Sequence, residues 1–217
     1  MRGLLTKDFL LVFKRKQTLI IFAAMALIMG FAMDGTFIIG YVTMLAAIVS
    51  VSTISYDEFE NGFSFLMTLP ISRKTYVFEK YLFCFLMSLA GWCVSIVIYA
   101  VGNTVKQIPM DLIGELPMLF AILPVMLLFT VLIIPLQLKF GVEKSRIAIF
   151  AIYGGMALIA FLVTKLISAS NIEVSKLLSA LNAIHPFHLL ILLSVLWLAI
   201  SFVSYLISVR IMEKKEF

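Results

Sequence analysis

Long apolar blocks separated by short polar segments make up most of the chain. Six blocks approach or reach the roughly 20 residues with which a helix crosses the hydrocarbon core of a bilayer. A helix satisfies its own backbone hydrogen bonds in lipid, and the sequence lacks the alternating pattern of membrane β-barrel strands. We therefore predict an all-α integral membrane protein, a single domain over residues 1–217 with six transmembrane helices. The predicted spans are residues 17–33, 36–55, 82–102, 118–138, 147–167 and 187–208.

Composition and charge support a membrane location and give the chain an orientation. The mean hydropathy is +1.12 and 63% of the residues are hydrophobic, well above the share in soluble domains. All but three of the 17 Lys and Arg residues fall on the side of the N-terminus; the exceptions are Lys106, Lys165 and Lys176. Short cytoplasmic loops carry such an excess, so we expect both termini to be cytoplasmic. The net charge of +5 then reflects membrane topology and not nucleic-acid binding.

Motifs for catalysis or nucleotide binding are missing from the sequence. It contains no G-x-x-x-x-G-K-[ST] phosphate-binding loop and neither H-E-x-x-H nor G-x-S-x-G, so we expect no enzyme activity in this chain. His185 and His188 lie at the start of the last span without a nearby Cys or carboxylate, which favours interfacial histidines over a metal site. Cys84 and Cys93 point to opposite faces of one predicted helix and cannot pair. No charge falls at the centre of a span, which disfavours a proton-coupled carrier.

One polar segment between the second and third spans, residues 56–81, has a distinct organisation, and we call it the coupling segment. Projected as a helix, residues 57–69 separate into two faces, and Pro70 ends this helix because it lacks a backbone N–H. Ser72 is a suitable N-cap for the helix that follows. The polar face comprises Asp57, Glu60, Asn61, Ser64 and Thr68, and the apolar face comprises Phe59, Phe63 and Leu66.

The sign of the charge on this helix indicates what it contacts. Helices that lie on the inner leaflet carry Lys and Arg on their polar face, because the lipid headgroups are negative. Here the charged residues are Asp57, Glu58 and Glu60, whereas Arg73 and Lys80 follow only near the membrane boundary. An acidic helix with aromatic residues is better suited to a groove on a protein partner.

The coupling segment also resembles a known family. The patterns E-x-x-N-G and L-x-T-L-P-I-S-R-x-x-Y-V-x-x-K, which run from Glu58 to Lys80, resemble the corresponding segment of ABC-2-type permeases. These permeases are the six-span membrane subunits of ATP-binding-cassette exporters, and this segment seats on a separate ATPase subunit. The motif match implies docking residues Glu58, Asn61 and Gly62, and corner residues Leu69, Pro70, Ser72 and Arg73. The two helix faces described above add Asp57, Phe59, Glu60 and Phe63 to the predicted docking residues.

The resemblance further implies partners and an assembly. Two ATPase subunits would bind ATP and Mg²⁺, with no cofactor in this chain, and a second copy of this permease or a homologous one would complete the transporter. The N-terminal stripe of Leu5, Phe9, Val12 and Phe13 predicts the amphipathic helix with which family members begin. The small-residue pairs Ala26/Gly30 and Gly91/Ser95 suggest close helix contacts between copies. Pro124 and Pro135 are expected to bend the fourth span, and residues 168–186 to contain a short external helix.

The transported molecule is suggested by composition and by a further resemblance. With 19 Phe and 12 Met residues, the chain offers an adaptable apolar interior. Its short six-span form is similar to bacterial plasma-membrane permeases that export membrane-active peptides such as phenol-soluble modulins. We expect amphipathic, hydrophobic peptides as cargo, for export or immunity. The alternatives are an exporter of lipophilic drugs or lipids, and a membrane sensor or scaffold subunit that transports nothing; the pathway residues stay unassigned.

Overall fold

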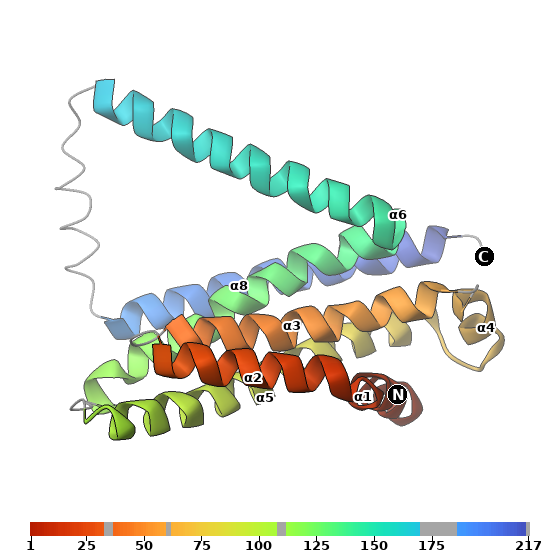
Figure 1. The fold of residues 1–217 in the computed structure, drawn as a ribbon. Helices are drawn as coiled ribbons and strands as arrows, with labels where there is room; N and C mark the ends of the chain where they lie inside the picture. Colours follow the sequence, from red (N-terminus) through yellow and green to blue (C-terminus); the bar gives the residue numbers. More distant parts are fainter. Residues whose placement is uncertain (33–36, 60–61, 108–111, 170–185, 216–217) are drawn as a thin grey trace.

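The computed structural model describes residues 1–32, 37–59, 62–107, 112–169 and 186–215, and every regular element in these ranges is a helix (Figure 1). The prediction of an all-α chain is confirmed for this part of the sequence. The helices are α1 (Arg2–Lys14), α2 (Lys16–Ala32), α3 (Phe37–Glu58), α4 (Gly62–Thr68), α5 (Arg73–Val105), α6 (Leu112–Ala169) and α8 (Pro186–Lys214).

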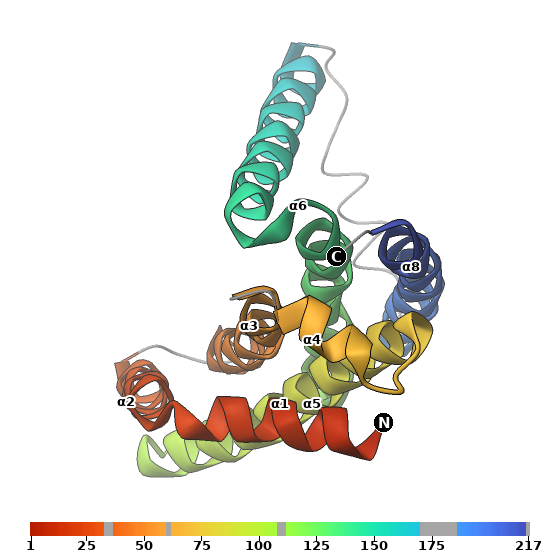
Figure 2. The same ribbon diagram turned by 90° about the vertical axis from the view of Figure 1, so that its right-hand side faces the viewer.

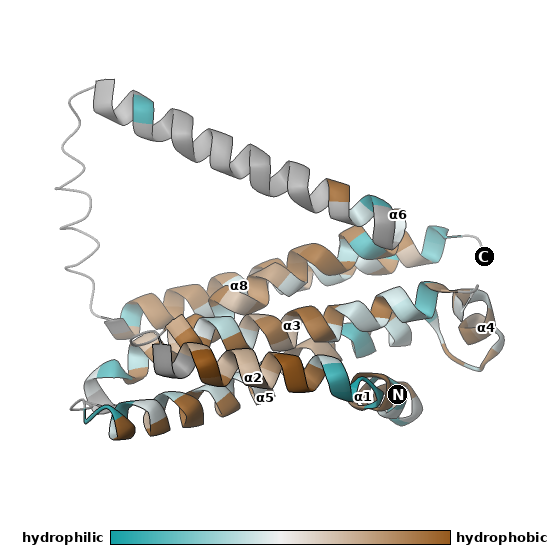
Figure 3. Ribbon diagram, in the orientation of Figure 1, coloured by the Kyte–Doolittle hydropathy of each residue, from teal (hydrophilic) through white to brown (hydrophobic). Residues whose placement is uncertain are grey.

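The long helices form a bundle with one polar end. Helix α3 packs against α5 and α6, and α6 packs against α8. Helix α1 runs crosswise to the long helices, as Figure 2 shows, and α4 and both chain termini lie at the same end of the bundle. Apolar residues cover the middle of the long helices, and hydrophilic residues concentrate at the end that carries α1 and α4 (Figure 3).

Four helices in the described residues are long and apolar enough to cross a membrane: Phe37–Glu58, Arg73–Val105, Gly114–Gly141 and Phe187–Lys214. They correspond to four of the six predicted spans. The first predicted span, 17–33, forms the shorter apolar helix α2. The fifth predicted span, 147–167, lies in the second half of α6, where the structure describes the backbone but few of the side chains. The external helix predicted at 168–186 lies almost wholly outside the described residues.

Helix α6 contains a sharp break in its helical geometry at Gly141. This residue has φ 73° and ψ 177°, a backbone region that is essentially restricted to glycine. Beyond it the second half of α6 turns away from the bundle (Figure 1). Pro124 and Pro135, at which the sequence predicts a bend, lie within the helical part of α6 before this break. The break separates the predicted spans 118–138 and 147–167, which the structure joins in one element.

A glycine on α5 allows α5 to approach α3 closely. A Cβ atom at Gly91 would meet the Cβ of Ala46 at 2.5 Å and the carbonyl oxygen of Val42 at 3.3 Å. Ser95, one turn later, is fully buried. The expectation that Gly91 and Ser95 face a second copy is therefore wrong, since both serve packing within the chain.

Candidate functional site

The coupling segment forms a helical corner at the polar end of the bundle, although its first helix differs from the prediction. The sequence predicts one helix over residues 57–69, whereas α3 continues to Glu58 and the separate helix α4 starts at Gly62. Gly62 makes this tight connection possible, because a Cβ atom there would lie 2.7 Å from the carbonyl oxygen of Asp57. Glu60 and Asn61, two predicted docking residues, lie between these helices and outside the described residues.

The buried face of α4 packs on the rest of the chain. Phe63 and Leu66 are buried, and the Phe63 ring contacts the ring of Tyr76 edge-on with 5.7 Å between centroids. The ammonium group of Lys215 lies 4.7 Å from the centre of the Phe63 ring. Phe63, one of the predicted docking residues, therefore joins α4 to α5 and to the C-terminal segment.

The opposite side of the corner presents aromatic rings to the surroundings. Phe59 is 70% exposed and Phe65 is 68% exposed, and Leu69 and Pro70 are also exposed. Glu58 is half-buried at the edge of this surface, next to Gly141 of α6. We call Phe59, Phe65 and Leu69 the exposed corner face.

The second half of the corner follows the prediction closely. Ser72 is the N-cap of α5, and its hydroxyl oxygen accepts a hydrogen bond from the backbone N–H of Thr75 at 3.1 Å. Arg73 reaches the end of α8, where Nη1 donates to the carbonyl oxygens of Met212 at 2.9 Å and Glu213 at 2.6 Å. The last carbonyl groups of a helix have no partner within it, so Arg73 caps α8.

A cluster of charged side chains is buried between α1, α3 and α5, directly beside the corner. The ammonium group of Lys80 pairs with the carboxylate of Asp8 and lies 2.7 Å from Oδ2 of Asp57. Lys7 pairs with the other oxygen of Asp57 and lies 3.2 Å from Oδ1 of Asp8. We call Lys7, Asp8, Asp57, Glu79 and Lys80 the buried charge cluster.

Two hydroxyl groups complete the contacts of this cluster. Tyr76 donates to Oδ2 of Asp57 at 2.9 Å, and Thr53 donates to Oδ2 of Asp8 at 3.1 Å. Lys80 also donates to the Thr53 hydroxyl at 3.1 Å. Glu79 differs from the other members, because neither of its carboxylate oxygens accepts a hydrogen bond from the described residues and the Lys80 ammonium is 4.0 Å away. The described cluster thus holds three carboxylates and two ammonium groups.

The placement of Asp57 corrects the predicted polar face. Its side chain is almost completely buried and paired with Lys7 and Lys80, so it does not belong to an exposed acidic stripe. Lys80, which the sequence places at the membrane boundary among headgroups, is fully buried as well. Asp57 and Lys80 are buried together because a buried carboxylate and a buried ammonium group each need the other as a counter-charge.

The cluster and the corner form one connected set of contacts. Phe63 of α4 packs on Tyr76, Tyr76 donates to Asp57 of α3, and Asp57 pairs with Lys80, which holds Asp8 of α1. Contacts therefore run from α4 through α5 and α3 to α1. Packed elements of this kind move as units and not by continuous deformation.

Helix α1 confirms the predicted N-terminal helix, and its buried face overlaps the predicted stripe but is rotated away from Phe13. Leu4, Asp8 and Val12 are its buried residues, spaced four apart, whereas Phe13 of the predicted stripe is exposed. The sequence analysis missed Asp8. Its position in register with Leu4 and Val12 was the available signal, since a carboxylate on an apolar stripe needs a buried partner.

A cavity of about 1090 Å³ lies beside the cluster, between the α1–α2 junction, α3 and the break in α6. We call it the polar cavity. Its lining includes Phe22 and Phe59 as well as the charged residues Arg15, Glu58 and Lys144. The guanidinium of Arg15 stacks over the ring of Tyr56 at 4.1 Å. The cavity therefore offers apolar surface and charges of both signs.

The remaining candidates from the sequence lie apart from this site. Cys84 and Cys93 are both free thiols, the first buried and the second exposed, which agrees with their predicted opposite faces. His188 is exposed in the first turn of α8, and His185 lies outside the described residues.

The apolar bundle with its helical corner identifies an integral membrane protein of the helical class. A family model of the ABC-2 family transporter proteins matches residues 3–213. The match covers nearly the whole sequence, so the chain belongs to the ABC-2 family of transporter proteins, whose members are permease subunits that work with an ABC ATPase. The comparisons found no significant match among curated proteins or among solved structures.

Proposed function

We propose that this chain is the permease subunit of a bacterial plasma-membrane ABC exporter that moves amphipathic, hydrophobic peptides. In the proposed complex, two ATPase subunits bind ATP and Mg²⁺, and a second copy of this chain or a homologous permease completes the membrane part. The polar end of the bundle faces the cytoplasm, which agrees with the bias of Lys and Arg along the sequence. Family membership is the observation that carries this proposal.

The exposed corner face is the proposed docking surface for the ATPase. Phe59 and Phe65 are large apolar side chains left in water at the polar end of the bundle, and exposed apolar patches of this kind mark protein contacts. Aromatic side chains that enter a partner's pocket also dominate binding energies at interfaces. Glu58 lies at the edge of this surface and contributes charge, whereas Asp57 and Phe63 support the corner from inside.

The polar cavity supports an amphipathic cargo. Arg15 and Lys144 offer partners for acidic groups, and the phenyl rings of Phe22 and Phe59 offer apolar contact. A cargo that is only apolar would displace water from Arg15 and Lys144 without supplying a counter-charge. A peptide helix with one apolar and one charged face satisfies both kinds of surface.

The docking surface is tested by co-purification with the ABC ATPases encoded in the same genome. Phe65→Ser removes an exposed ring and should weaken ATPase binding at least tenfold, the size typical of a hot-spot residue. Ser64→Ala, on the exposed neighbouring position of α4, is the matched control and should leave binding unchanged. Equal ATPase recovery with all three proteins would contradict the proposed surface.

The cargo is tested with the permease–ATPase complex in nanodiscs. An amphipathic helical peptide should stimulate ATP hydrolysis, and Lys144→Glu should shift the preference toward peptides with a more basic polar face. If such peptides leave the rate of ATP hydrolysis unchanged and lipids or lipophilic drugs increase it, the cargo is a lipid or a lipophilic drug and not a peptide. A complex that never hydrolyses ATP would instead favour a sensor or scaffold subunit.

A further inference from the structure

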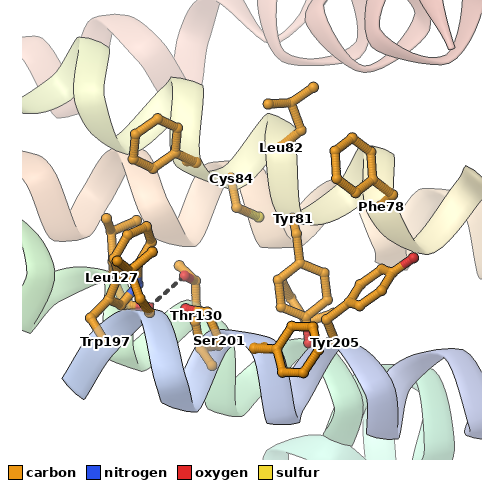
Figure 4. Close-up of a pocket in the computed structure, with 14 residues that line it drawn as sticks. Phe78, Tyr81, Leu82, Cys84, Leu127, Thr130, Trp197, Ser201 and Tyr205 are labelled. Carbon is orange, nitrogen blue, oxygen red and sulfur yellow. Dashed lines mark hydrogen bonds between the residues drawn. The ribbon is translucent and has the colours of Figure 1, made fainter. Parts of the chain in front are cut away.

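We propose that a second cavity, between α5, α6 and α8, is a binding site for a neutral lipophilic molecule that carries a hydrogen-bond acceptor such as an ester or amide carbonyl. We call it the apolar cavity. Its volume is about 450 Å³, within the roughly 300–1,000 Å³ typical of small-molecule sites. Figure 4 shows side chains of all three helices around it, with Tyr81 from α5, Thr130 from α6 and Trp197 from α8 among them.

The lining of the apolar cavity determines the charge of its ligand. The side chains around it are aromatic, aliphatic, hydroxyl or thiol groups, and none of the described lining residues is charged. A charged ligand would lose its hydration here without gaining a counter-ion, which is strongly unfavourable. The ligand is therefore neutral in the part that enters, in contrast to the cargo expected for the polar cavity.

Two buried donors in the wall have no partner in the described structure. The indole Nε1 of Trp197 and the hydroxyl of Ser201 are both shielded from the surface, and neither makes a hydrogen bond. Two comparable groups are paired: Nε1 of Trp92 donates to the carbonyl of Leu119 at 2.9 Å, and the hydroxyl of Thr130, in the same cavity wall, donates to the carbonyl of Leu127 at 2.8 Å. Buried polar groups in proteins are nearly always paired.

The spacing of these donors suits a single acceptor group. Trp197 and Ser201 lie four positions apart on α8, so their side chains share one face of the helix. The ring of Phe85 stacks on the Trp197 indole with 5.8 Å between centroids, which fixes the orientation of the indole. The hydroxyl of Tyr81, by contrast, already contacts the hydroxyls of Ser204 at 2.6 Å and Ser208 at 2.9 Å. A carbonyl oxygen is the acceptor that satisfies the Trp197 and Ser201 donors without adding charge.

The apolar cavity is accessible from the membrane. Leu198 and Phe202 line it and are themselves 58% and 64% exposed on the outer face of α8. A ligand therefore enters sideways from the lipid phase, where neutral lipophilic molecules are concentrated. This chemistry is shared by a bilayer lipid's acyl ester and by a free lipophilic ester or amide, and the experiment below separates the two sources.

The fluorescence of Trp197 provides the test. The chain has two Trp residues, so Trp92→Phe leaves Trp197 as the single indole of the permease in nanodiscs of phosphatidylcholine. Adding the methyl ester of a dibrominated fatty acid should quench this fluorescence with saturation. In the same background, Ser201→Phe fills the cavity and should abolish the saturable quenching, and Ser201→Ala should weaken binding about fivefold through one lost hydrogen bond. The matched control Val203→Phe, on the exposed face of α8, should preserve it.

A second arm replaces the nanodisc lipid with dibrominated phosphatidylcholine. If the brominated lipid quenches Trp197 in the Val203→Phe variant but not in the Ser201→Phe variant, the occupant is a bilayer lipid. If only the added ester gives saturable quenching, the occupant is a free lipophilic molecule. Either result supports the site, and equal quenching of the two variants in both arms overturns it.

Photolabelling of the unmodified chain with a diazirine fatty ester tests the same site without any substitution, so its result does not depend on whether the variants fold. Label within residues 78–85 or 127–134 supports the site, and label confined to exposed α8 residues such as Leu192 overturns it. Neither result depends on the ATPase or on the exported cargo.

Discussion

Lys80 on α5 and Asp8 on α1 form an ion pair in which both side chains are completely buried. The same ammonium group lies 2.7 Å from a carboxylate oxygen of Asp57 on α3. One lysine therefore joins the crosswise N-terminal helix to two long helices, at the end of the bundle that carries the coupling corner. Because this lysine neutralises two buried carboxylates, removal of any one of the three groups leaves a buried charge without its partner.

Replacing Lys80 with methionine should strongly destabilise the protein. The apolar side chain preserves approximate volume but leaves the carboxylates of Asp8 and Asp57 with Lys7 as their one cationic partner among the described residues, and loss of one member of a buried pair costs about 3–5 kcal/mol. We expect a clear decrease in the thermal unfolding temperature of the purified permease in detergent. Adding Asp8→Asn to Lys80→Met should restore part of the loss, since it removes one uncompensated charge.

Lys74→Met provides the control for this measurement. Lys74 lies on the same helix and pairs with Glu213 at 3.6 Å, but both side chains are largely exposed. Exposed pairs of this type contribute little, so the variant should unfold close to the temperature of the unmodified protein. If Lys80→Met and Lys74→Met were equally stable, the buried charge cluster would not hold these helices together.

Glu79 should respond in the opposite way to the other carboxylates of the cluster. It is fully buried, no hydrogen bond from the described residues reaches its oxygens, and it adds a third carboxyl group beside two lysines. Glu79→Gln removes the surplus charge with almost no change in shape, so we expect stability to be unchanged or to increase. Asp8→Asn, with the same change of charge at a paired position, should decrease it. Comparing the two unfolding temperatures checks this, and an equal decrease would show that Glu79 is needed in its charged form.

The sequence predicts the local features of the coupling corner better than its connections. Ser72 as the cap of α5 and the end of the preceding helix before Pro70 follow from residue chemistry within a few positions. The pairing of Asp8 with Lys80 spans 72 positions and depends on how α1 crosses α5, which no local pattern contains. The resemblance included Lys80 as a motif residue, yet a basic residue near a span end is ordinarily placed among headgroups.

Local sequence patterns also fail to show which face of α1, and which aromatic ring of the corner, is buried. Helix α1 is apolar on several sides, so the predicted stripe and the buried one are nearly equivalent in sequence, and only the buried partner of Asp8 selects between them. Phe59, Phe63 and Phe65 are likewise indistinguishable by hydropathy. The start of α4 at Gly62 rotates Phe63 inward and leaves Phe65 exposed. Packing against Tyr76, far beyond the helix itself, decides which ring is buried.

Gly141→Ala should disturb the break in α6. The backbone conformation of Gly141 is unfavourable for any side chain, and a Cβ atom there would overlap the carboxylate of Glu58. We expect a loss of stability of about 1–3 kcal/mol, together with reduced ATP hydrolysis by the assembled complex. Adding Glu58→Ala should recover only part of the stability, because it removes the overlap but not the backbone strain. Gly3→Ala on α1, where the added methyl group meets nothing within 4 Å, is the neutral control.

Arg73→Met should loosen the end of α8 without affecting the start of α5. The guanidinium donates to the carbonyl oxygens of Met212 and Glu213, whereas the α5 N-terminus is capped independently by Ser72. Hydrogen bonds from a charged donor contribute about 1.5–3 kcal/mol each, so the last turn of α8 should open more often. Hydrogen exchange should therefore accelerate at residues 209–215 and stay unchanged at residues 75–80. Arg210→Met, an exposed substitution one turn earlier on α8, should leave both segments protected. Faster exchange throughout α5 would mean that Arg73 supports the corner itself and that its contact with α8 is secondary.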